Sequence, residues 1–190
     1  KTVVGVNNGA DQDIDNNLYK SVEGQMAYQL TDKIKLTQNV VWSLDETNYG
    51  RENGGDRHPN LTLDSIAGYQ VTDKWAANLE YVYGNNNLGN WHGFGIWNRY
   101  QYNDWLAFNH RFEYFDDSSG NRLGVIDNST ASPNDGYNAW EMTFGVDFKI
   151  YSNLLTGLEY RFDRTDNTSR FDNGTNPDQS TFLASAIYSF

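Results

Sequence analysis

The chain has 190 residues, a formal net charge of −11 and no cysteine. The acidic balance argues against a nucleic-acid partner, because binding phosphates requires a basic surface. The lack of cysteine excludes disulfide bonds and thiolate metal sites. Only 38% of the residues are hydrophobic but 15% are aromatic, so much of the apolar material is rings suited to a surface with one wet side. The length suits a single domain over residues 1–190.

Apolar and polar residues alternate along almost the whole chain, which predicts strands. The connections alternate between short turns, such as 31–33 and 103–104, and long loops rich in Gly, Asn and Asp. Short turns at one rim and long loops at the other are typical of an antiparallel up-and-down transmembrane β-barrel. We expect the long loop 116–136 to fold into its mouth. The ten expected strands are 1–7, 18–31, 34–46, 61–72, 75–84, 91–103, 105–116, 137–150, 154–165 and 180–190.

Short repeats mark the same hairpin units. The sequences "YQLTD", "YQVTD" and "YQYND" begin at residues 28, 69 and 100, each at a short turn. The sequences "LEYVYG", "FEYFDD" and "LEYRFD" begin at residues 79, 112 and 158, in strands that follow short turns. Each unit is predicted to be one hairpin of the sheet.

The two faces of each strand differ in polarity: Trp140, Phe144 and Phe148 alternate with Glu141 and Asp147. A membrane barrel faces its apolar residues to lipid and its polar residues to water inside, whereas a soluble β-sandwich or lectin does the reverse. We favour the membrane barrel, because large rings are too numerous for one small interior and gather near both rims, as bilayer interfaces select. The predicted aromatic girdle comprises Trp42, Trp75, Trp91, Trp105 and Trp140.

Charged residues on the other face predict a hydrated lumen, because charges at membrane depth need water or a partner. We expect Glu80, Glu113 and Glu159 to lie at similar heights and to face arginines across the lumen. Acidic residues outnumber basic ones, which predicts a weak preference for cations; the alternative is a closed interior of salt-bridged struts. The predicted pore-lining residues are Glu23, Lys35, Asp64, Glu80, Arg99, Arg111, Glu113, Glu141, Asp147, Lys149, Glu159, Arg161 and Asp163.

The last strand, "STFLASAIYSF", ends on an aromatic residue with apolar residues two, four and eight places before it. This pattern resembles the assembly signal of bacterial outer-membrane barrels. The resemblance implies recognition by the barrel assembly machinery and contact of the last residue with lipid at the inner rim. The residues that fill the pattern are Phe182, Ala186, Tyr188 and Phe190.

Longer stretches resemble the OmpL-like β-barrel porin family: "VGVNNGADQDIDNN" near the start, "FEYFDD", "AWEMTFGVDFKIYSNLLTGLEYRFDRTDN" and "AIYSF". The resemblance implies a porin of the bacterial outer membrane that passes small hydrophilic solutes, contacts lipid and lipopolysaccharide, and has periplasmic turns and extracellular loops. Members of that family are longer, and strand 1–7 is too short to cross a bilayer. We therefore expect an N-terminally incomplete chain, the C-terminal part of a larger barrel; the sequence leaves homo-oligomer formation open.

Other functions have weaker support. A non-conducting structural barrel that anchors or encloses a partner protein is the alternative to the porin. We expect no enzyme activity and no cofactor, because Ser43 or Ser65 with His92 shows no catalytic motif. Residues 11, 13 and 15 are aspartates at calcium-loop spacing, but Asn16 and Val22 stand where that loop needs Gly and Glu; we expect a solvated acidic loop and no metal.

One residue fits the pattern poorly. His110 falls on the lipid-facing side of its strand, for which we expect either a bulge or a shift of register.

Overall fold

The structure is a computed structural model of residues 1–190. It describes residues 1–7, 20–46, 57–86, 89–120, 122–123, 136–166, 171 and 175–190, without the side chains of 44–46 and 57–58. All ten predicted strands are confirmed, with ends within four residues of the expected ones. They are β1 (Thr2–Asn7), β2 (Ser21–Gln29), β3 (Ile34–Glu46), β4 (Arg57–Thr72), β5 (Trp75–Asn86), β6 (Gly89–Gln101), β7 (Leu106–Asp117), β8 (Tyr137–Tyr151), β9 (Leu154–Thr165) and β10 (Asp178–Tyr188).

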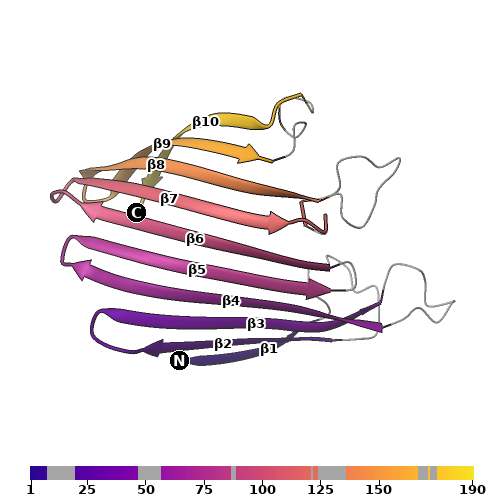
Figure 1. The fold of residues 1–190 in the computed structure, drawn as a ribbon. Helices are drawn as coiled ribbons and strands as arrows, with labels where there is room; N and C mark the ends of the chain where they lie inside the picture. The colour runs from indigo at the N-terminus through magenta and orange to yellow at the C-terminus, as the bar shows by residue number, and fades with distance from the viewer. Residues whose placement is uncertain are drawn as a thin grey trace.

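The strands form one curved sheet in chain order, each antiparallel to the next (Figure 1). The predicted up-and-down topology is therefore confirmed. The sheet is open, because β1 and β10 are its two edges and do not pair with each other. In the part of the chain that the structure describes, no helix is long and apolar enough to cross a membrane.

The repeated pentapeptide builds the short turns. After β4, the hydroxyl of Thr72 accepts hydrogen bonds from the backbone amides of Lys74 and Trp75, at 3.3 and 3.1 Å. The side-chain amide of Gln70 donates to the carbonyls of Thr72 and Trp75, at 2.6 and 3.3 Å. These bonds satisfy backbone groups that the sheet ladder leaves open at a turn. The same arrangement is made by Gln29 with Thr31 and by Gln101 with Asn103.

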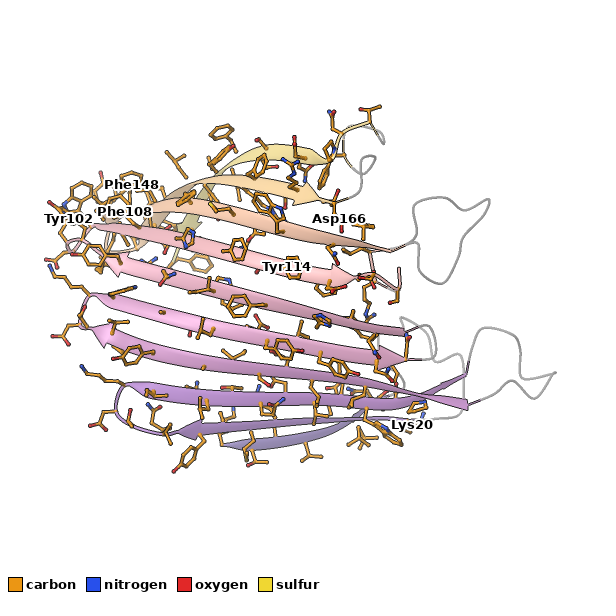
Figure 2. All side chains as sticks on the ribbon, viewed as in Figure 1. Lys20, Tyr102, Phe108, Tyr114, Phe148 and Asp166 are labelled. Atoms are coloured by element: carbon orange, nitrogen blue, oxygen red, sulfur yellow. The ribbon has the colours of Figure 1, made fainter. Side chains whose placement is uncertain are left out.

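Burial is inverted relative to a soluble protein. Among the described side chains, only two hydrophobic ones, Trp91 and Ala107, are buried, and the other buried side chains are polar. Large apolar side chains cover the opposite face and are exposed, as the side chains of Figure 2 illustrate. We call the two surfaces the polar face and the apolar face of the sheet. The buried polar residues are Ser21, Ser43, Asp117, Glu141, Thr143, Asp163 and Thr165.

Aromatic rings gather at the short-turn rim. Tyr102 meets Phe108 edge to face at 6.4 Å between ring centroids, and Trp105 stacks on Phe148 at 6.3 Å. Figure 2 labels Tyr102, Phe108 and Phe148 at this rim. Trp105 is 52% exposed. Rings at this level suit the interface between lipid and water.

Candidate functional site

The polar face carries all thirteen predicted pore-lining residues, because side chains alternate between the two faces along the paired stretches of each strand. The pairing of the strands fixes how they line up. Glu80 pairs with Gly95, which pairs with Glu113; Glu113 pairs with Glu141, which pairs with Asp163. We call these four acidic residues the acidic row. That this face lines a lumen remains a prediction.

The centre of the row is the carboxylate of Glu141. It is 5% exposed and lies between two arginines from the neighbouring strands. Arg111 donates through Nε and Nη2 to the two carboxylate oxygens, at 2.5 and 3.2 Å. Arg161 Nε lies 3.2 Å from Glu141 Oε2, which also accepts a 2.7 Å hydrogen bond from Thr143. A buried carboxylate needs this many partners, because it has left water.

The charge network continues toward β10. Arg161 also binds the carboxylate of Asp163, with Nε at 2.7 Å and Nη2 at 2.5 Å from Oδ1. Asp163 Oδ2 in turn accepts a 3.2 Å hydrogen bond from Gln179. Glu113 is engaged more loosely, 3.7 Å from Arg111 Nε. Of the three carboxylates of this network, Glu113, Glu141 and Asp163, Glu113 therefore has the longest ion-pair contact.

Two smaller polar groups lie on the same face. Near the short-turn rim, Arg99 forms an ion pair with Asp147 and donates to Asn109 at 2.9 Å. On the earlier strands, Asn39 accepts from Gln25 at 2.9 Å and donates to Asp64 Oδ2 at 2.8 Å. The polar face is thus lined by hydrogen-bonded groups of both signs over most of its width.

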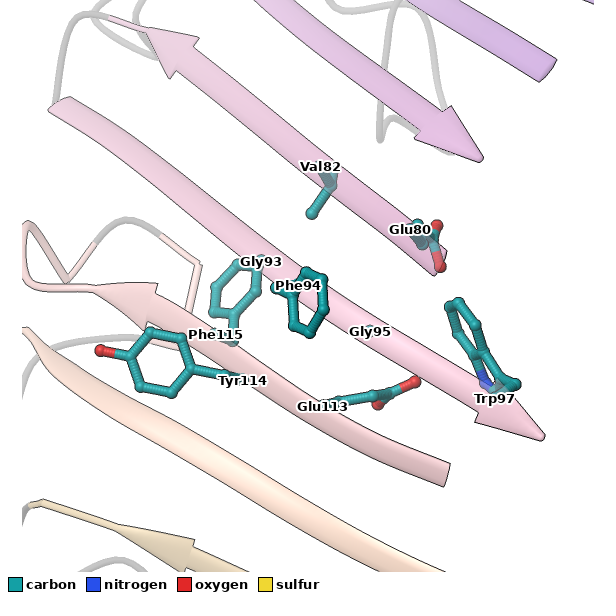
Figure 3. Close-up of a pocket in the computed structure, with 9 residues that line it drawn as sticks. All are labelled: Glu80, Val82, Gly93, Phe94, Gly95, Trp97, Glu113, Tyr114 and Phe115. Carbon is teal, nitrogen blue, oxygen red and sulfur yellow. The ribbon is translucent and has the colours of Figure 1, made fainter. Parts of the chain in front are cut away.

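A hollow of about 200 Å³ separates two members of the acidic row (Figure 3). Glu80 and Glu113 lie on either side of β6, where Gly93 and Gly95 present no side chain. The ring of Trp97 lies beside Gly95, since a Cβ there would stand 2.9 Å from the ring. The hollow therefore places two carboxylates and an aromatic ring around bare backbone.

The expected arrangement of opposed charges is only partly correct. Glu80 and Glu113 do share a row, as predicted. Glu159 does not: it pairs with Gly145 and lies four residues along β9 from Asp163. Among the described residues, Arg99, Arg111 and Arg161 bind carboxylates beside them on the same sheet; that they also face charges across a lumen remains a prediction.

The prediction for Trp91 is wrong. It was assigned to the aromatic girdle, but it lies on the polar face and is 2% exposed. Its ring packs on Gly84 of the paired strand, and the guanidinium of Arg122 lies 4.4 Å from the ring centroid. Trp91 therefore supports the base of the loop that follows β7, and cannot contact lipid.

The loop base is itself tied down. Asp117, which is fully buried, accepts hydrogen bonds through Oδ2 from the backbone amides of Arg122 and Leu123, at 2.7 and 2.6 Å. Ser119 donates to the carbonyl of Asn90 at 3.0 Å. The described start of loop 116–136 is thus bonded to side chains of the polar face; that the loop folds into the mouth of a barrel remains a prediction. Asp117 is not among the predicted site residues, although its strand parity places it on the same face as Glu113, four residues farther along β7.

The remaining girdle and assembly residues lie where their parity places them. Trp42, Trp75 and Trp140 belong to the apolar face, and Trp105 stacks on Phe148 there. Phe182 is 81% exposed on β10, and the last residue, Phe190, follows the end of that strand. Recognition of this strand by an assembly machine remains a prediction. The other two residues of the pattern, Ala186 and Tyr188, share the apolar face with Phe182.

His110 lies on the apolar face without a bulge, because the pairing of β7 is continuous on both sides. The expected irregularity is therefore wrong. Its ring packs against Phe144 at 5.0 Å between centroids. Ser43 lies on the polar face and His92 on the apolar face, so the structure does not bring this pair together. The aspartates at 11, 13 and 15 lie outside the described residues.

Comparison with known proteins agrees with the fold. The structure resembles the NanC porin (TM-score 0.58, 12% identity, covering 90% of this chain and 79% of that one). It also resembles an anion-selective porin from Comamonas acidovorans (0.63, 10%, covering 90% and 49%). A third match is OmpT of Vibrio cholerae (0.59, 11%, covering 90% and 56%). The chain thus spans only about half the length of the last two. No curated protein sequence matches.

These neighbours are outer-membrane β-barrels. Because their sequence identities to this chain are low, the likeness shows only the fold. The family itself follows from the sequence. A protein-family model described as "Putative beta-barrel porin-2, OmpL-like" matches residues 1–190, the whole chain. The chain belongs to this family of outer-membrane porins.

Proposed function

We propose that this protein lets small hydrophilic solutes and ions diffuse passively across the outer membrane, through a lumen lined by the polar face. The observation that carries the proposal is the inverted sheet of a porin-family chain. Most of the charged residues of its described strands lie on one face, many of them in ion pairs and hydrogen bonds, while large apolar side chains are exposed on the other. Ionisable groups at membrane depth are tolerated where they face water or one another.

The lumen follows from closure of the sheet. In a closed barrel, β1 and β10 each pair with a further strand. We propose that these strands belong to a barrel larger than the ten strands described. Barrels of about sixteen strands enclose an aqueous channel, whereas about eight strands leave an interior that side chains fill. The short turns then lie in the periplasm and the long loops outside the cell, in contact with lipopolysaccharide.

No chemical step is part of this function, and selectivity comes from pore width and wall charge. The thirteen pore-lining residues comprise eight carboxylates and five basic groups. We therefore expect a weak preference for cations. At the loop base, Arg122 and Asp117 add one charge of each sign and do not change this balance.

The test is single-channel conductance of the purified full-length protein in a planar bilayer with a salt gradient. We expect steady open steps and a reversal potential that favours cations. The Glu80→Gln, Glu113→Gln double variant should move that potential toward zero, and Arg99→Gln should move it the other way. If protein shown to be folded gives no channel current, the proposal is overturned in favour of a structural barrel that anchors a partner.

A further inference from the structure

A second, larger hollow lies at the long-loop end of the polar face. It has a volume of about 510 Å³ and is bounded by β7, β8, β9 and β10 together with Leu123 and Phe171. This is within the range of small-molecule sites, about 300–1,000 Å³. Among the described residues, its walls come from these four neighbouring strands and from Leu123 and Phe171.

The hollow offers one group of each sign that its neighbours leave partly open. Glu113 is 38% exposed, and its shortest ion-pair contact among the described residues is the 3.7 Å approach of Arg111. Arg161 is 41% exposed and binds its carboxylate partners through Nε and Nη2. Within the described part of the chain, Arg161 Nη1 donates no hydrogen bond. A loosely paired carboxylate and one open guanidinium edge therefore share the hollow, while Glu141 and Asp163, which also line it, are bound to the arginines of the network.

The side of the hollow toward the loops is apolar. Leu123 is held in place by Asp117, which binds its amide, and by the hydroxyl of Tyr137, which donates to its carbonyl at 3.0 Å. Phe171 forms a two-residue bridge with Asn176, with hydrogen bonds of 2.9 and 3.1 Å. Phe115 adds a ring from β7. Apolar walls with a few placed polar groups are the usual composition of a ligand site.

We propose that this hollow is a binding site for zwitterionic solutes with a small apolar side chain, of the amino-acid type. The solute's ammonium group pairs with Glu113, and its carboxylate accepts from Nη1 of Arg161. Its side chain packs against Leu123 and Phe171. An arginine edge suits a carboxylate because charge-assisted hydrogen bonds to it are strong and directional. The inference deepens the proposed function, on which it rests, by naming a solute class.

The test is binding of L-leucine to the folded protein in detergent by isothermal titration, alongside block of single-channel current. Leucinamide carries only the positive charge and 4-methylpentanoate only the negative one. We expect both to bind at least about tenfold more weakly than leucine, since each lacks one charged hydrogen bond. Equal binding of leucine and leucinamide, or no leucine binding up to its solubility, would overturn the proposal.

Two variants locate the site. Glu113→Gln should weaken leucine binding about tenfold. Arg161→Lys keeps the charge between Glu141 and Asp163 but loses the planar fork, and should weaken it similarly. Glu159→Gln removes one charge from the same face outside the hollow and should leave leucine affinity unchanged; an equal loss there would refute the assignment.

The two proposals fail separately. Open channels without leucine binding contradict the site and leave the porin standing. Leucine binding to a protein that forms no channels contradicts the porin and leaves the site.

Discussion

The indole ring of Trp91 lies against the backbone of Gly84, its register partner on the neighbouring strand. A Cβ added to residue 84 would stand 1.9 Å from two ring carbons. The ring therefore fills the space that a side chain would take, and the guanidinium of Arg122, at the loop base, lies over the ring at 4.4 Å from its centroid. The loop base is thus held over the polar face through a glycine on β5.

Gly84→Ala should destabilise the protein, because the added methyl group displaces the Trp91 ring from its position against the backbone of residue 84. Overpacking of this kind costs about 1–3 kcal/mol. Urea denaturation in detergent, followed by tryptophan fluorescence, measures both the stability and the exposure of the ring. Gly145→Ala is the matched control, since a Cβ there meets its nearest atom at an ordinary 3.5 Å. Equal stability of the two variants would contradict the packing described.

The turn motif predicts a second loss of stability. Thr72→Val removes the hydroxyl that accepts from the amides of Lys74 and Trp75, at about 0.5–1.5 kcal/mol for each bond. Thr62→Val is the same change on the same strand, at a hydroxyl that makes no hydrogen bond among the described residues. The denaturation midpoint should fall for Thr72→Val and stay within error for Thr62→Val. If both midpoints fall equally, the pentapeptide does not act through its turn.

The sequence was sufficient to predict which face each charged residue takes, because side chains alternate strictly along a strand. Trp91 shows how that rule can be overlooked. It shares its parity with Arg99, which was assigned to the pore, but was placed by its nearness to the rim. The same parity would have put it on the polar face.

Rows across the sheet were harder to predict. Thr37, Glu80, Glu113 and Asp163 lie in one row and are the fourth, sixth, eighth and tenth residues of β3, β5, β7 and β9. Each hairpin is thus displaced by two residues, the constant stagger that barrels require. Glu159 matches Glu80 in its motif but not in its row, because a local repeat does not record this displacement. The lateral ion pairs depend on the rows and were missed with them.

Glu141 should contribute more to stability than other carboxylates of the polar face. Glu141→Gln leaves Arg111 and Arg161 close together without the charge between them. Removing one partner of a buried ion pair costs about 3–5 kcal/mol, whereas exposed pairs contribute about 1 kcal/mol or less. Glu159→Gln, with no ion pair among the described residues, should change the free energy of unfolding by less than about 0.5 kcal/mol. A small effect at Glu141 would show that water screens this cluster in the folded protein.

The assignment of the two faces can be tested directly, because the chain has no cysteine. Asn78 and Leu79 are exposed neighbours on β5 that belong to opposite faces. In liposomes, a charged, membrane-impermeant maleimide should label Asn78→Cys, because we propose that the polar face lines a water-filled lumen. It should spare Leu79→Cys, on the face proposed to contact lipid, until the protein is denatured. Mass spectrometry of the intact protein gives the labelled fraction, and the unmodified chain sets the background. Labelling of Leu79→Cys with protection of Asn78→Cys would mean that the apolar face is turned inward, as in a soluble barrel.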